Sequence, residues 1–110
     1  MATDLDFIEF VYDCIRDTGA IRHKRMFGEC MFYCDDRAVI LVTNNTAHVK
    51  ILPETTAIFA NFGITPDKAF PYDGAREHYV LDIENTDLAI EIIRTLARIL
   101  PVPKPKKSKR

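Results

Sequence analysis

The chain has 110 residues, of which 47% are hydrophobic and 28% are charged, as is typical of an ordinary globular protein and not of a wholly disordered chain. A chain of this length buries enough surface for one cooperative core and too little for a second sizeable domain. No apolar run approaches the ~20 residues that cross a bilayer, and the acidic N-terminal segment lacks the positive end and apolar stretch of a signal peptide. We therefore predict a single-domain cytoplasmic protein without a membrane partner.

The formal net charge of −1 conceals an uneven distribution along the chain. Residues 1–100 carry 10 basic and 16 acidic residues, whereas residues 101–110 carry five basic residues and no acidic one. Prolines at alternate positions favour extended chain there, so we predict a folded domain over residues 1–100 and a flexible basic tail. Such a tail binds nucleic-acid phosphates weakly and without sequence preference, or it serves as a solubilising terminus, or it folds back onto the acidic body. Its basic residues are Lys104, Lys106, Lys107, Lys109 and Arg110.

The first predicted element is an amphipathic helix over residues 4–18. Its apolar residues recur at spacings of three and four, which predicts one broad buried face. Thr3 with Asp6 is a capping signal, and Gly19 is expected to end the helix in a left-handed conformation. The residues of the apolar stripe are Leu5, Ile8, Val11, Tyr12 and Ile15.

An antiparallel meander of three or four strands is predicted next. Residues 21–27 have polar side chains on both faces of an extended chain, which indicates an edge strand. An acidic turn at residues 35–37 leads into residues 38–43, whose apolar run lacks alternation and predicts a central strand covered on both faces. Asn44 and Asn45 tolerate positive φ and mark the following turn.

The second half of the chain predicts a short helix, a strand pair and a final helix. Pro53 suits the first turn of a helix that Gly63 ends. Strands are expected at residues 69–72, as an edge strand because of Pro71, and at residues 77–83. An apolar face then predicts a helix over residues 86–100. The order α-β-β-β(β)-α-β-β-α indicates an α+β fold, an antiparallel sheet with helices packed on it.

The cysteines and histidines are candidates for a thiol or metal site. Three cysteines in a chain without an export signal disfavour a disulfide framework and indicate reduced thiols. Cys30 and Cys34 share one strand face but lie about 13 Å apart along it, too far for joint ligation within one straight strand. A site that recruits a histidine from another segment stays open. His23 and His48 are expected on polar-facing strand positions and His78 at the start of a strand, each exposed or hydrogen-bonded rather than a ligand.

No constellation in the sequence predicts an active site. The four glycines are too far apart for a phosphate-binding loop, and the only serine, Ser108, lies in the tail. Adjacent acids at Asp35 and Asp36 point to opposite faces of an extended chain, which argues against a catalytic dyad. We therefore predict a non-enzymatic protein with no catalytic residue, no cofactor and no metal.

Residues 24–36, KRMFGECMFYCDD, resemble the opening of the N-terminal domain of the TfoX/Sxy family, whose typical run is Arg-Met-Phe-Gly, an apolar strand and an acidic turn. Val49-Lys50 resembles the end of that family's third strand, and Phe62-Gly63 the end of its short helix. The resemblance covers about residues 15–100. It implies an α+β fold similar to that of secretion chaperones and a regulatory, non-enzymatic role. Longer members of that family regulate natural competence genes together with a cyclic-AMP receptor protein.

The leading hypothesis is a regulatory protein-binding module whose partner belongs to the transcription machinery. Arg22, Lys24 and Arg25 place basic groups on both faces of the predicted edge strand, where an acidic partner or a second copy of the chain can dock. In an opposing interpretation, Arg25 pairs with a carboxylate of the body and holds the strand in place. The alternatives are nucleic-acid binding by the tail together with these residues, and a thiol or metal site at Cys30 and Cys34.

Overall fold

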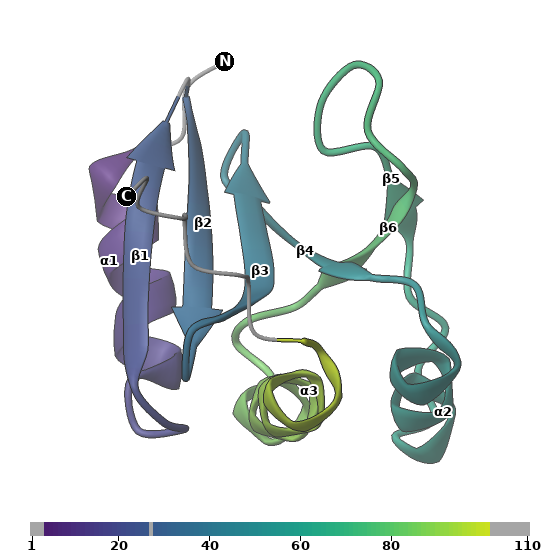
Figure 1. The fold of residues 1–110 in the computed structure, drawn as a ribbon. Helices are drawn as coiled ribbons and strands as arrows, with labels where there is room; N and C mark the ends of the chain where they lie inside the picture. Colours follow the sequence, from purple (N-terminus) through teal and green to yellow (C-terminus); the bar gives the residue numbers. More distant parts are fainter. Residues whose placement is uncertain (1–3, 27, 102–110) are drawn as a thin grey trace, which may run out of the picture.

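The computed structural model describes residues 4–26 and 28–101 (Figure 1). Within them, three helices and one six-stranded antiparallel sheet follow the order α-β-β-β-β-α-β-β-α, which confirms the predicted α+β class. The elements are α1 Leu5–Ile15, β1 Ile21–Met26, β2 Glu29–Cys34, β3 Arg37–Thr43, β4 Thr46–Lys50, α2 Pro53–Asn61, β5 Lys68–Ala69, β6 His78–Leu81 and α3 Thr86–Ile99.

The strands lie in the order β1-β2-β3-β4-β6-β5, and every neighbouring pair is antiparallel. Two turns of the meander are two-residue loops with positive φ at both positions, 51° and 70° at Asp35 and Asp36, and 55° and 57° at Asn44 and Asn45. This conformation matches the right-handed twist of the strands that it joins. β3 lies inside the sheet, and its last five residues are buried in succession, which confirms the predicted central strand.

All three helices pack on one face of the sheet. In Figure 1, α1 lies behind β1 and β2, where the Tyr12 ring is 6.0 Å from that of His23 on β1, and α3 lies beside α2. Alternation along β2 turns Cys30, Phe32 and Cys34 into the core that the helices share. Residues of the opposite parity, such as Met31 and its cross-strand neighbour Leu41, lie on the other face, which we call the open face.

The predicted role of Gly19 is wrong. α1 ends at Ile15, and the Thr18 hydroxyl donates to the Ile15 carbonyl oxygen at 2.7 Å, so the helix closes before the glycine. Gly19 does not adopt a positive φ. A Cβ atom at this position would lie 2.7 Å from Cys34 Sγ, so glycine is required here by the close approach of the chain to β2.

The predicted strand at residues 69–72 is wrong in its extent. β5 spans only Lys68–Ala69, although it does occupy the edge position that was expected. Pro71 has no N–H to donate to a strand ladder. Its carbonyl oxygen instead accepts a hydrogen bond from Thr43 Oγ1 at 2.9 Å, and the chain leaves the sheet to form a loop over residues 70–77.

Three predicted features lie outside the described residues. They are Thr3 in the helix cap, Phe27 at the end of the first strand, and the basic tail with Lys104, Lys106, Lys107, Lys109 and Arg110. In the described part of the chain, Asp4 is the N-cap residue of α1. The Asp4 N–H donates to Asn45 Oδ1 at 2.9 Å, which joins the start of α1 to the β3–β4 turn.

Candidate functional site

The predicted edge strand β1 is an edge of the sheet. No strand of the described part of the chain pairs with its outer side, and the other edge strand, β5, has only two residues. All four side chains from Arg22 to Arg25 are exposed. β1 is therefore the long open edge of this sheet, and it carries three cations within four positions.

The backbone of β1 offers hydrogen-bonding groups to this outer side. The Asp35 N–H donates to the Ala20 carbonyl oxygen at 3.0 Å, which marks these opposed residues as a hydrogen-bonded pair. Because such pairs alternate along an antiparallel ladder, the N–H and C=O groups of Ile21, His23 and Arg25 point away from β2. Three residues of β1 can thus accept an additional strand.

The basic side chains divide between the two faces, as predicted. Arg22 and Lys24 lie opposite Tyr33 and Met31 on the open face. The ring of His23 lies 6.0 Å from that of Tyr12 on α1, which places the odd-numbered side chains of β1, including Arg25, on the helix face.

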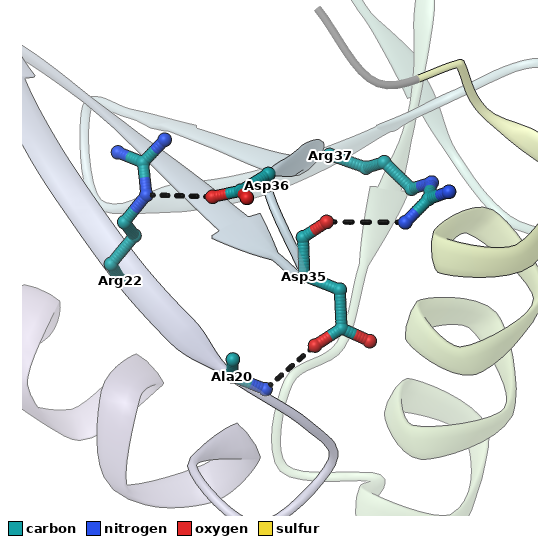
Figure 2. Close-up of polar contacts among 5 residues, drawn as sticks. All are labelled: Ala20, Arg22, Asp35, Asp36 and Arg37. Carbon is teal, nitrogen blue, oxygen red and sulfur yellow. Dashed lines mark hydrogen bonds and ion pairs between the residues drawn. The ribbon is translucent and has the colours of Figure 1, made fainter.

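Arg22 is the basic residue that the fold holds in place. Its Nε lies 3.5 Å from Asp36 Oδ1 (Figure 2). Its guanidinium carbon lies 4.2 Å from the centroid of the Tyr33 ring. Asp35 Oδ1 accepts from the Ala20 N–H at 3.0 Å, so one acidic turn fixes the start of β1. Arg25 takes part in neither of the two ion pairs formed among residues 4–26 and 28–101.

The thiols are poorly placed for chemistry. Cys30 and Cys34 are both buried in the core under the helices. Burial raises the pKa of the Cys30 thiol and of the Cys34 thiol, which disfavours the thiolate that reacts or binds metal. Within the described ranges, no group of three potential ligands lies close enough to hold a metal ion.

A pocket of about 370 Å³ lies on the open face of the sheet, between β3, β4 and the 70–77 loop. Apolar side chains of β2 and β3 form its floor, among them Met31 and Leu41. Its polar residues come from three separate segments of the chain. They are His48 and Lys50 of β4, Tyr72 and Arg76 of the loop, and His78 of β6.

The two histidines of this pocket have the same orientation toward the backbone. His48 Nδ1 lies 3.1 Å from the Leu41 carbonyl oxygen, and His78 Nδ1 lies 2.8 Å from the Arg76 carbonyl oxygen. A carbonyl oxygen only accepts hydrogen bonds, so each Nδ1 donates and each neutral ring keeps its lone pair on Nε2. The ring centroids are 6.4 Å apart, with the rings nearly perpendicular.

His48 is hydrogen-bonded, as one of the two expected environments, but the predicted polar-facing position is wrong, because the side chain is only 3% exposed. β4 lies between β3 and β6, and the loop that follows β5 covers the open face at this point. Alternation along β4 correctly separates His48 from Ala47 and Val49, but both faces of the strand are covered. No signal in the sequence indicates that a loop more than 20 residues away folds over His48.

The titration of His48 makes the stability of the fold depend on pH. Burial lowers the pKa of His48, the hydrogen bond to Leu41 partly opposes this shift, and the nearby His78 adds to it. The unfolded chain binds this proton at about pH 6.5, whereas the folded chain binds it only at a lower pH. The free energy of unfolding is therefore expected to fall as the pH drops below about 6.5, by at most about 1.4 kcal/mol per pH unit from this residue.

Chemical denaturation of His48→Gln across this pH range measures the effect as a change of slope. The variant is expected to lose the slope, whatever its stability at pH 7. The matched control is His23→Gln, which replaces an exposed histidine and is expected to keep the slope. An unchanged slope in His48→Gln would contradict the assignment.

The comparisons with known proteins match the whole chain to an uncharacterized protein. An uncharacterized 12.7 kDa protein in the trpE 5' region of Spirochaeta aurantia is 33% identical over 111 aligned positions, which cover 99% of this chain and 93% of that protein. No family model matches the chain. No helix in the described part of the chain is long and apolar enough to span a membrane.

Proposed function

The chain belongs to one family with this spirochaete protein, and we propose that it acts as a non-enzymatic module that binds a regulatory protein partner along β1. The observation that carries the proposal is the open six-residue edge with Arg22, Lys24 and Arg25 exposed on it. The resemblance to the N-terminal domain of the TfoX/Sxy family supports a regulatory role in the cytoplasm, with a partner from the transcription machinery.

The charge of the edge favours an acidic extended segment as the partner. An added strand would pair with the outward N–H and C=O groups of Ile21, His23 and Arg25, while its own side chains would meet the cations of β1. An antiparallel pairing of two copies of β1 would instead bring Arg22, Lys24 and Arg25 against the same cations. Like charges opposite one another destabilise strand pairs, so the edge favours an acidic partner over a second copy.

The double variant Arg22→Glu/Lys24→Glu tests this surface. Because attraction turns into repulsion at two exposed positions, the variant is expected to bind its partner at least about tenfold more weakly. The matched control, Arg94→Glu/Arg98→Glu, makes the same change of charge on the exposed side of α3. The measurement is quantitative affinity capture from a cell extract, with circular dichroism to show that both variants fold.

A captured partner must also meet a structural criterion. Hydrogen exchange of the wild-type protein with that partner is expected to slow at the amides of Ile21, His23 and Arg25. A set of captured proteins that is identical for the wild type and the Arg22→Glu/Lys24→Glu variant would rule out β1 as the binding surface. Equal losses in the α3 control would show a non-specific effect of charge.

A further inference from the structure

The pocket on the open face carries a local charge opposite to that of the domain around it. Residues 1–100 hold 16 acidic and 10 basic residues. Two of the basic residues, Lys50 and Arg76, line the pocket together with His48 and His78. Among the described residues, none that lines it is acidic. Two cationic side chains and two imidazole rings therefore share one concave site that no described carboxylate lines.

The site is built into the fold at its inner end. Only 3% of the surface of His48 is exposed, and the one hydrogen bond that its ring forms with the described residues uses Nδ1. Its Nε2 is left without a partner among the described residues. The register of β4 and β6 sets Lys50 directly opposite His78, so these two side chains project from the same face of the sheet. Lys50 lies two positions from His48, on the same face of β4.

The other walls of the pocket are apolar. Met31, Val39 and Leu41 line it from β2 and β3, and Tyr72 borders it from the loop. A volume of about 370 Å³ lies at the lower end of the range for small-molecule sites. One end of the pocket thus suits an anionic group, and its floor suits an apolar body.

We propose that this pocket binds a small organic anion, with its carboxylate or phosphate group held by Lys50 and Arg76 and its apolar body against Met31 and Leu41. Arginine and lysine form charge-assisted hydrogen bonds with both groups, and they do so more strongly in a cavity than on a flat surface. A metal ion is the weaker alternative for the two imidazoles. The two fixed cations repel it, and the described residues offer no third ligand.

The proposal is independent of the edge strand, because β4 and β6 are separated from β1 by β2 and β3. Its test uses different residues and a different measurement from those at β1. Phenyl phosphate and benzoate serve as anionic probes, benzyl alcohol as a neutral analogue, and benzylamine as a cationic one. Titrations of the ¹⁵N-labelled full chain by nuclear magnetic resonance in 150 mM salt map where each probe binds.

The expected result is saturable binding of one or both anions, with shifts concentrated in β4, β6 and the 70–77 loop. Phenyl phosphate alone identifies a phosphate site, benzoate alone a carboxylate site, and both a general anion site. The neutral and cationic analogues are expected to bind at least about tenfold more weakly, the loss expected for one charge-assisted hydrogen bond. Equal binding of benzyl alcohol, or shifts scattered over the surface, would overturn the proposal.

Substitutions separate the basic groups of the pocket from other cations of the chain. The variant Lys50→Gln/Arg76→Gln is expected to weaken anion binding at least about tenfold. The control variant Lys68→Gln/Arg94→Gln removes the same charge at exposed positions that do not line the pocket, and it is expected to bind as the wild type does. Retention of full affinity by Lys50→Gln/Arg76→Gln, with its fold intact, would show that the pocket is not the site.

Discussion

Replacing Phe32 with alanine is expected to lower the free energy of unfolding by about 3–5 kcal/mol, the range for large aromatic residues in well-packed cores. Phe32 is fully buried in the middle of β2, on the face that the helices cover. Its ring also packs 5.1 Å from that of His23 on β1. Truncation removes apolar contacts to the helices and leaves a cavity. The sheet cannot close this cavity, because β2 is held between β1 and β3. Urea denaturation followed by circular dichroism measures the change.

The matched control is Phe70→Ala, which deletes the same atoms from a side chain that is 64% exposed. Its effect is expected to stay within about 0.5 kcal/mol, because no buried contact is lost. Similar destabilisation by the two variants would show that Phe32 does not lie in the core as the structure places it.

Gly19→Ala is expected to destabilise the protein by about 1–3 kcal/mol through overpacking. The added methyl group would lie 2.7 Å from Cys34 Sγ and 3.3 Å from Asp35 Oδ1. Cys34 is buried, so its sulfur has little room to move, and the Asp35 carboxylate is held by its hydrogen bond to the Ala20 N–H. Thermal unfolding monitored by circular dichroism measures the loss.

A second substitution distinguishes this clash from a general loss of backbone freedom at Gly19. In a Cys34→Ala background the sulfur is absent, and the new methyl group partly fills the space that it leaves. The double variant is therefore expected to be more stable than the sum of the two single effects predicts. Strict additivity would mean that Gly19 and Cys34 do not meet.

Gly19 was singled out correctly from the sequence, but its role in the structure differs from the predicted one. A glycine just beyond an amphipathic stripe is typical of a helix that ends in a left-handed residue. The chain instead ends α1 at Ile15, where the Thr18 hydroxyl closes the helix, and it uses Gly19 where the backbone approaches β2. Cys34 lies 15 positions further along the chain, and no local pattern connects the two. Only the packing of the α1–β1 connection against the end of β2 reveals the need for glycine.

The edge strand β1 and the pocket on the open face differ in how far the sequence alone predicts them. The edge strand was predictable, because polar residues on both faces of residues 21–26 are incompatible with a central position in the sheet. The pocket was not, because its basic residues come from β4, the 70–77 loop and β6. Each of them alone has the appearance of an ordinary polar surface residue. His48 becomes a buried base only when the loop covers the open face.

The sequence by itself determined the helices, the meander and its two tight turns, and the central place of β3. These features depend on short-range preferences, namely the period of apolar residues and the ability of Asp and Asn to adopt positive φ. The tertiary structure alone decided where the chain leaves the sheet near Pro71, why Gly19 is a glycine, and how His48, Lys50, Arg76 and His78 come together. Those outcomes depend on segments that are distant in the sequence and that meet only when the whole chain packs.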